Sequence, residues 1–97
     1  MEFEIVIHID RKPYRMQVKR IYEGDLIEKF EVKGGSRSII LWNNGPELKL
    51  KKSRKKPVWK IEKGEIPTNP QSFALTVLAI EKKIEEIEKE AKKPTLL

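Results

Sequence analysis

Few residues in this 97-residue chain could perform acid–base or nucleophilic chemistry. His8 is the only histidine, there is no cysteine, and Asp10 follows His8 two positions later. A His–Asp pair can act as a general base, but only beside a group that it activates. The serines nearest to that role have turn, strand, loop and helix-start contexts that explain each of them: Ser36, Ser38, Ser53 and Ser72. We expect an ordinary surface histidine and no catalytic residues.

Cofactor and metal chemistry have equally little support. A single histidine without cysteine provides few ligands for a transition metal, so we expect no metal site and no cofactor. Gly34-Gly35 lacks the spaced glycines or the Gly-Lys-Ser sequence that cradles a phosphate, and is typical of a hairpin turn. The carboxylates of the C-terminal segment are matched by lysines, which argues against an acid pair with raised pKa. We predict that the chain is not an enzyme.

The formal net charge of +6 is concentrated in one segment. Residues 49–63 contain eight basic residues and one acidic residue, whereas the residues before and after them are nearly balanced. Most of these cations lie together: Lys49, Lys51, Lys52, Arg54, Lys55 and Lys56. Such a cluster can neutralise phosphates and release their counterions. Two other interpretations stay open, a solvated loop without a partner and lysines that keep an edge strand from aggregating.

Period-2 alternation of apolar and polar residues predicts an antiparallel sheet of four to five strands within one domain, 1–97. The expected strands are about 2–9, 14–21, 26–33, 37–43 and 58–62, with a further short edge strand over 47–51. Turn residues separate them, including Gly34-Gly35. The fold class is therefore α+β, strands first and a helix last.

The C-terminal segment predicts one long helix over 70–91, with Asn69 as N-cap and Pro70 in its first turn. Its apolar stripe steps by four and three residues: Phe73, Val77, Ile80, Ile84, Ile87 and Ala91. About 22 residues span about 33 Å as a helix, more than the length of the strands, so the helix outruns its sheet. The narrow seam of Ile84, Ile87 and Ala91 predicts a homodimer. A solvated helix end with Glu–Lys pairs is the alternative.

Alternation also divides the sheet residues between two faces. The residues expected to face the helix are Phe3, Ile5, Ile7, Tyr14, Met16, Val18, Leu26, Phe30 and Val32. The opposite face then presents mostly basic and polar side chains: His8, Arg15, Gln17, Lys19, Lys29 and Lys33. On the fourth strand Ile40 and Trp42 share one face, and alternation does not decide which. An outward Trp42 would be a stacking residue for bases, and an inward one a core or dimer-interface residue. Trp59 is expected in the core.

The order of these elements is similar to a known family. Antiparallel strands, a basic connection and a closing helix resemble the single-stranded-DNA-binding fold of the transcriptional coactivator PC4 and the PUR-domain proteins, a Whirly-like layout. The segment Asn69-Pro-Gln-Ser-Phe73 is similar to the Asn-Pro-Glu start of the PC4 helix. The resemblance implies a dimer with a basic outward sheet face. A short strand over 47–51 departs from the four-strand pattern of that family.

The sequence therefore predicts a small homodimeric module that binds single-stranded DNA or RNA. The expected nucleic-acid contacts are Arg15, Lys19, Lys29, Trp42, Lys49, Lys51, Lys52, Arg54, Lys55 and Lys56. The alternative function is a protein-interaction module that uses the C-terminal helix. The acidic, alternating N-terminus is unlike a signal peptide, and no run of 18 apolar residues is present, so we expect a cytoplasmic protein without a membrane partner.

Overall fold

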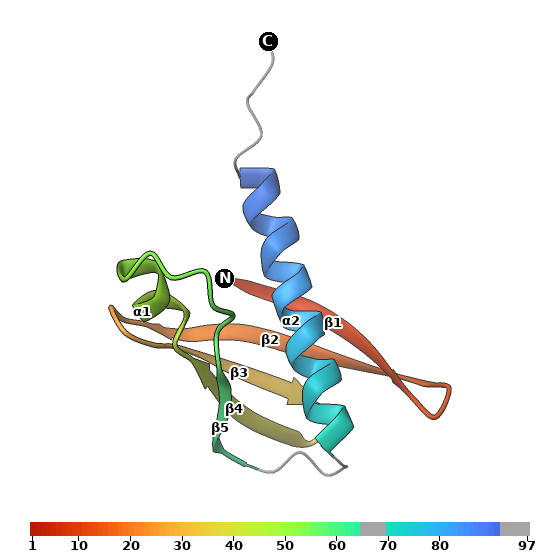
Figure 1. The fold of residues 1–97 in the computed structure, drawn as a ribbon. Helices are drawn as coiled ribbons and strands as arrows, with labels where there is room; N and C mark the ends of the chain where they lie inside the picture. Colours follow the sequence, from red (N-terminus) through yellow and green to blue (C-terminus); the bar gives the residue numbers. More distant parts are fainter. Residues whose placement is uncertain (65–69, 92–97) are drawn as a thin grey trace.

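The computed structural model describes residues 1–64 and 70–91 and has the α+β arrangement that the sequence predicts. Five antiparallel strands follow one another in chain order across an open sheet, and a long helix lies on one of its faces (Figure 1). The strands are β1 (Glu2–Ile9), β2 (Lys12–Glu23), β3 (Glu28–Gly34), β4 (Arg37–Asn43) and β5 (Trp59–Lys63). The helices are α1 (Gly45–Leu50) and α2 (Pro70–Ala91). Every strand thus pairs with its neighbour in sequence.

The prediction of a strand over 47–51 is wrong, because this segment forms helix α1. The Asn43 side-chain oxygen accepts a hydrogen bond from the Gly45 N–H at 2.8 Å, and Pro46 follows in the first helical turn. A proline there fixes a helical φ without losing a backbone bond. The Leu-Lys alternation that suggested a strand instead leaves Leu50 on the surface, 65% exposed. The Asn43–Gly45 hydrogen bond and Pro46 favour a helix here more strongly than five residues of alternation favour a strand.

Two hairpins have backbone conformations that L-residues seldom adopt. Asp10 and Arg11 connect β1 to β2, and both have positive φ, 51° and 66°. Two successive positive φ values give the turn twist that matches a two-residue hairpin. Gly35, between β3 and β4, has φ 61°, as the Gly34-Gly35 prediction requires. The short turns fix the register of β1 against β2 and of β3 against β4.

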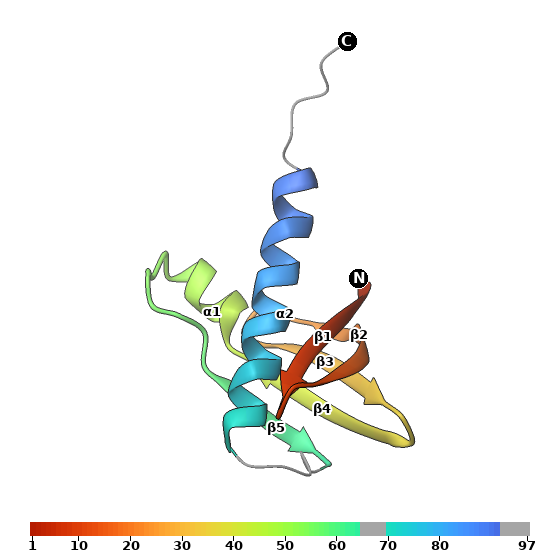
Figure 2. The ribbon, with the colours of Figure 1, turned by 90° about the vertical axis from the view of Figure 1, so that its right-hand side faces the viewer.

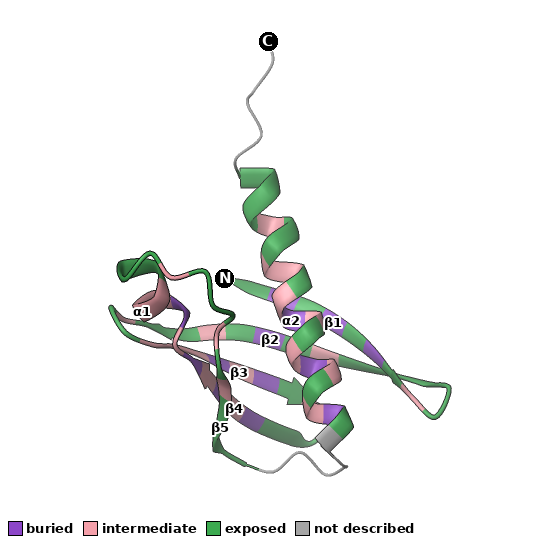
Figure 3. Cartoon of the chain, viewed as in Figure 1, coloured by how far each residue is buried: buried purple, intermediate pink, exposed green. Residues whose placement is uncertain are grey.

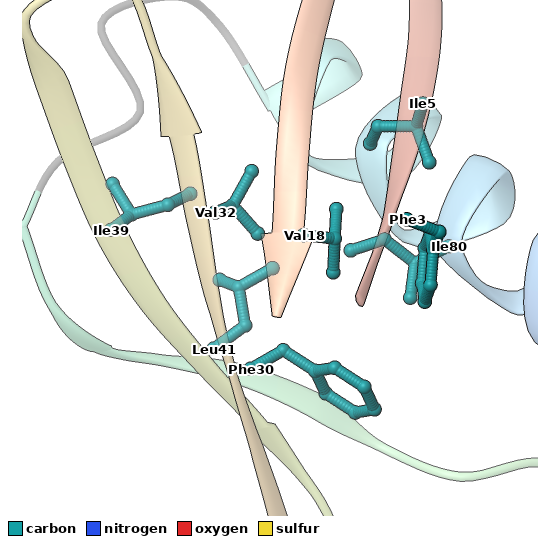
Figure 4. Close-up of a cluster of buried hydrophobic side chains, with 8 residues drawn as sticks. All are labelled: Phe3, Ile5, Val18, Phe30, Val32, Ile39, Leu41 and Ile80. Atoms are coloured by element: carbon teal, nitrogen blue, oxygen red, sulfur yellow. The ribbon is translucent and has the colours of Figure 1, made fainter. Parts of the chain in front are cut away.

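The core lies between α2 and the face of the sheet that we call the inner face. Its buried side chains come from β1 to β4 and from the middle of α2 (Figures 3 and 4): Phe3, Ile5, Val18, Phe30, Val32, Ile39, Leu41 and Ile80. Trp59 packs against Phe30 with ring centroids 5.5 Å apart, so its predicted core position is confirmed. Leu26 was expected on this face, but it precedes β3 and is 58% exposed. Tyr14, also expected on this face, pairs with Ile7 but remains 46% exposed.

Helix α2 has the predicted bounds, but its contact line with the sheet is rotated from the predicted stripe. Ser72, Thr76 and Ile80 are buried, and the Thr76 hydroxyl donates to the Ser72 carbonyl at 2.8 Å. Ile84 and Ile87 are half-buried against the chain's own core, whereas Ala91 is exposed. Small polar residues in the first turns therefore approach the sheet more closely than the apolar pattern predicts. The expected N-cap, Asn69, lies outside the described residues.

The C-terminal turns of α2 project beyond the sheet, as Figures 1 and 2 both show. The helix crosses the strands and passes β1, which forms one edge of the sheet. Among the described residues, no helix combines the length and apolar character needed to cross a bilayer.

Candidate nucleic-acid interface

A row of alternating aromatic and basic side chains crosses four strands on the outer face, the face of the sheet opposite α2. The strand registers pair Tyr22 with Lys29, Lys29 with Trp42, and Trp42 with Lys60. Side chains directly opposite one another in adjacent strands lie on the same face. The order across β2, β3, β4 and β5 is therefore aromatic, lysine, aromatic, lysine. We call these four residues the aromatic–lysine row.

Each lysine of the row lies over a neighbouring ring. The Lys29 Nζ is 5.6 Å from the centroid of Tyr22, and the Lys60 Nζ is 5.7 Å from the centroid of Trp42. These distances are within the range for cation–π attraction. Lys29 also contacts the Glu62 carboxylate at 2.6 Å, which fixes its position between strands. The row is thus ordered through contacts among its own members and one neighbouring acid.

The structure places Trp42 on the outer face, which alternation alone left undecided. Its chain neighbours Leu41 and Asn43 point inward, with 0% and 1% exposure, and Trp42 itself is half-buried. Leu41 and Asn43 pair with Ile61 and Trp59 on the inner side of β5. Trp42 therefore lies on the sheet surface opposite α2, where part of its side chain is accessible to a ligand.

Tyr22 is a candidate that the sequence reasoning missed. The register of β2 against β3 shifts between Arg20 and Tyr22, so Ile21 is an extra residue in β2. This bulge turns Tyr22 outward, although strict alternation from Val18 would place it inward. The signal in the sequence is Arg20, a charged residue at a position where the alternation requires an apolar one. Arg20 lies inward and reaches Glu28 at 3.4 Å.

Tyr22 is well presented for contact with a ligand. Its side chain is among the exposed apolar groups, at 50%. A Cβ added at Gly24 would come within 2.6 Å of the Tyr22 hydroxyl, so the ring lies closely against the backbone of this glycine. A ring that is supported on one side by backbone and exposed on the other loses little conformational entropy when a base stacks on it.

The other predicted outer-face cations are more widely spread. Arg15 lies near the opposite end of the sheet, where its guanidinium contacts Glu4 at 3.1 Å. Lys19 is exposed and, among the described residues, has no carboxylate within 4.0 Å. Lys33 contacts Glu31 at 3.5 Å. The structure therefore brings Lys29 and Trp42 together, leaves Lys19 nearby, and separates Arg15 from them.

The basic run covers the end of α1 and the loop after it, and we call residues 49–56 the basic segment. Two of its lysines have acidic partners, Lys51 with Glu47 at 2.9 Å and Lys49 with Glu88 of α2 at 4.0 Å. The remaining cations contact no carboxylate within the described part of the chain: Lys52, Arg54, Lys55 and Lys56. All four are exposed. Their charge is available to an external anion.

The basic segment lies in the connection between β4, which ends one residue after Trp42, and β5, which begins one residue before Lys60. The Asn44 side-chain oxygen accepts the Val58 N–H at 2.8 Å and closes the loop at its base. On its other side the segment faces α2 across a cavity of about 310 Å³, whose lining includes Leu48, Lys55 and Glu85. The segment therefore lies beside α2, at the end of the sheet where β4 passes to β5.

His8 lies exposed on the outer face of β1, opposite Pro13. Within residues 1–64 and 70–91, no three or more His, Asp or Glu side chains are grouped so that they could hold a metal ion.

A scan against protein-family models, a search of curated proteins and a search of solved structures each found no match to this chain. The resemblance to the PC4 and PUR-domain fold accordingly stays a prediction.

Proposed function

We propose that this protein binds single-stranded nucleic acid on the outer face of its sheet. The observation that carries the proposal is the aromatic–lysine row, in which Tyr22 and Trp42 alternate with Lys29 and Lys60. Exposed aromatic rings stack on unpaired bases, and adjacent cations contact the phosphates that connect those bases. A duplex keeps its base faces inside the stack, so a row of this kind favours a single strand. DNA and RNA are both compatible with stacking.

The basic segment supplies the electrostatic part of the proposed site. Its four unpaired cations lie in the connection between β4 and β5, the strands that carry Trp42 and Lys60. A strand whose bases stack on Tyr22 and Trp42 can continue past Lys60 and follow the segment with its phosphates. Counterion release from such contacts makes binding sensitive to salt. We retain the expectation that the protein works in the cytoplasm, where the absence of cysteine fits a reducing environment.

The alternative function, a protein-interaction module built on the C-terminal helix, has less support. Ile84 and Ile87, which were to form the exposed seam, are half-buried against the protein's own core. Of the predicted dimer residues only Ala91 is exposed. The outer face offers more unshared binding groups than α2.

Oligonucleotide titration in a Trp59→Phe background tests the proposal. The chain has two tryptophans, so this variant leaves Trp42 as the sole indole reporter. The Trp59 indole N–H is buried and unpaired among the described residues, so its removal sacrifices no hydrogen bond. Quenching of Trp42 by a single-stranded oligomer, at lower concentration than by the matching duplex, is the expected result. Absence of binding at low salt rejects the proposal.

The salt dependence of that titration shows whether the phosphate contacts come from the basic segment or from the positive charge of the protein in general. Replacing Lys52, Arg54 and Lys56 with Gln should lower the slope of log affinity against log salt by about 2, because each single-strand phosphate contact contributes about 0.7. The matched control removes three lysines from α2: Lys82, Lys83 and Lys89. The control should retain the slope of the unmodified protein. Equal slopes in the two triple variants would move the phosphate contacts away from the basic segment.

A further inference from the structure

Strand β1 is an edge of the sheet whose outward backbone groups have no partner among the described residues. The Arg20 N–H donates to the Met1 carbonyl at 2.9 Å, and the register then pairs Glu2 with Lys19. In an antiparallel pair, alternate residues bond the neighbouring strand and the residues between them point away. The odd-numbered residues of β1 therefore bond β2. The amides and carbonyls of Glu2, Glu4, Val6 and His8 point out of the sheet.

The other edge, β5, carries features that oppose pairing with a further strand, and β1 lacks them. Two of the five β5 residues are lysines, and its register against β4 shifts between Ile40 and Leu41. Lysines and bulges are common protections of edge strands. The eight residues of β1 contain no lysine and no proline, and they pair with β2 without interruption. At the centre of β1, Val6 is 41% exposed.

We infer that β1 pairs antiparallel with β1 of a second copy of this chain, with the two-fold axis at Val6. This register is the one that the side chains favour. Glu4 lies opposite His8 of the partner subunit, a pair of complementary charge when the imidazole is protonated, and Val6 lies opposite its own copy. An axis at Glu4 would instead oppose two carboxylates. The even-numbered residues point outward, so the register at Val6 forms about six backbone hydrogen bonds.

The inner faces are compatible with the same register. Ile5 then lies opposite Ile7 of the partner subunit, which continues the apolar inner surface across the interface. Ile80 of α2 and Phe3 of β1 belong to the same buried cluster (Figure 4), and α2 packs against β1, so we take the crossing to lie near Phe3, three residues from the axis. Two such crossings are separated by about six residues, roughly 20 Å along the strands. Packed helices need only about 8–10 Å between axes, so the two copies of α2 fit.

The projecting end of α2 has a defined position in this dimer. It passes β1 near Phe3, and the register places Ile9 of the partner subunit opposite Phe3. There Ile7, Ile9 and Tyr14, together with Ser72 and Thr76 at the start of α2, line an open cavity of about 420 Å³. The partner's helix end extends toward that opening. The inference concerns assembly and does not depend on nucleic-acid binding.

Sedimentation equilibrium of edge variants tests the interface. Val6→Lys places two lysines opposite each other at the axis and should raise the dimer Kd by roughly tenfold or more. Val6→Pro removes an N–H that the monomer does not use, and should have the same effect. Ser38→Lys, an exposed outer-face change of the same charge away from the edge, is the control and should leave the Kd unchanged. Circular dichroism checks that each variant is folded.

Substitutions of His8 should change the dimer Kd in a direction that only this register predicts. His8→Lys should lower the dimer Kd, because a full positive charge faces Glu4 of the partner subunit, and His8→Glu should raise it by a few-fold or more. A wild-type protein that remains monomeric at millimolar concentration overturns the inference. So does a dimer that Ala91→Glu dissociates while Val6→Lys does not, since that outcome places the interface on α2.

Discussion

Single residues on neighbouring strands give the two faces of this sheet different roles. Trp59 packs inward on Phe30, while Trp42, on the adjacent strand, lies outward beneath the Lys60 ammonium. The same residue type thus stabilises the core at one position and forms part of the proposed ligand surface at the other. Trp59 lies opposite Asn43, the residue after Trp42. Successive side chains of a strand point to opposite faces, so the two tryptophans lie on different sides of the sheet.

Tyr22→Ala tests the residue that the sequence did not indicate. Loss of a base-stacking ring should weaken single-strand binding by about 1–2 kcal/mol, a decrease of roughly five- to thirtyfold in affinity. Because the side chain is 50% exposed, the variant should fold normally. Fluorescence anisotropy of a labelled oligonucleotide measures the effect.

A second tyrosine provides the matched control for that change. Tyr14 is 46% exposed, but it lies at an inner-face position at the other end of β2. Tyr14→Ala should leave oligonucleotide affinity within about twofold of the wild type. If both variants bind equally weakly, or equally well, Tyr22 is not a stacking residue.

At the scale of elements, the β1–β2 hairpin contains conformational strain that a substitution can relieve. Arg11 has φ 66°, in the left-handed region that costs an L-residue about 1–2 kcal/mol. Arg11→Gly should therefore raise the free energy of unfolding by about 0.5–1 kcal/mol, after the extra entropy that glycine gives the unfolded chain. Urea unfolding followed by circular dichroism measures the change.

The β3–β4 hairpin supplies the opposite substitution as a control. Gly35 has φ 61° and open space where a Cβ would be, so Gly35→Ala introduces only backbone strain. It should lower stability by about 1 kcal/mol. A stabilising effect of Gly35→Ala, or a destabilising one of Arg11→Gly, would contradict the turn conformations described for the two hairpins.

The elements themselves were largely predictable, because local alternation and turn residues determine them. β1, β4 and α2 have the predicted bounds, β2 is longer at both ends, β3 starts two residues later, and β5 is shifted by one. Helix α1 was missed because five residues of alternation look alike in a strand and in a short helix. Arg20 at an inward position is the local signal for the bulge at Ile21, but the register shift itself depends on how β2 matches β3 in space.

The candidate site was predictable in its charge but not in its geometry. The concentration of cations over 49–63 is a property of the sequence, and so is the aromatic character of Trp42. Which carboxylates pair with those cations cannot be predicted from the sequence. Lys49 pairs with Glu88, 39 positions further along the chain, and Arg15 lies far from the basic segment because cross-strand register places it at the other end of the sheet.

For the whole molecule, α2 is the element that covers the inner face, and Ile80 is its fully buried contact, with 0% exposure. Ile80→Ala should lower the free energy of unfolding by about 3 kcal/mol, a large share of the roughly 5–10 kcal/mol expected for a domain of this size. Circular dichroism and tryptophan fluorescence should lose signal in one common transition, because sheet and helix share one core.

The corresponding control lies two residues away on the same helix. Leu78 points away from the sheet and is 60% exposed, so Leu78→Ala should change stability by less than about 0.5 kcal/mol. A cost at Leu78 equal to that at Ile80 would mean that another surface covers this side of α2 in solution.

The extra residue at Ile21 determines more than one side chain. After Ile21, each residue of β2 points to the opposite face from the one that uninterrupted alternation would give it. If Ile21 were instead paired in register with Lys29, Tyr22 would return to the interior and Glu23 would point outward. The chain would keep its composition, yet lose half of the aromatic surface. In this protein, the register of a strand carries information about the surface that its residue types alone do not.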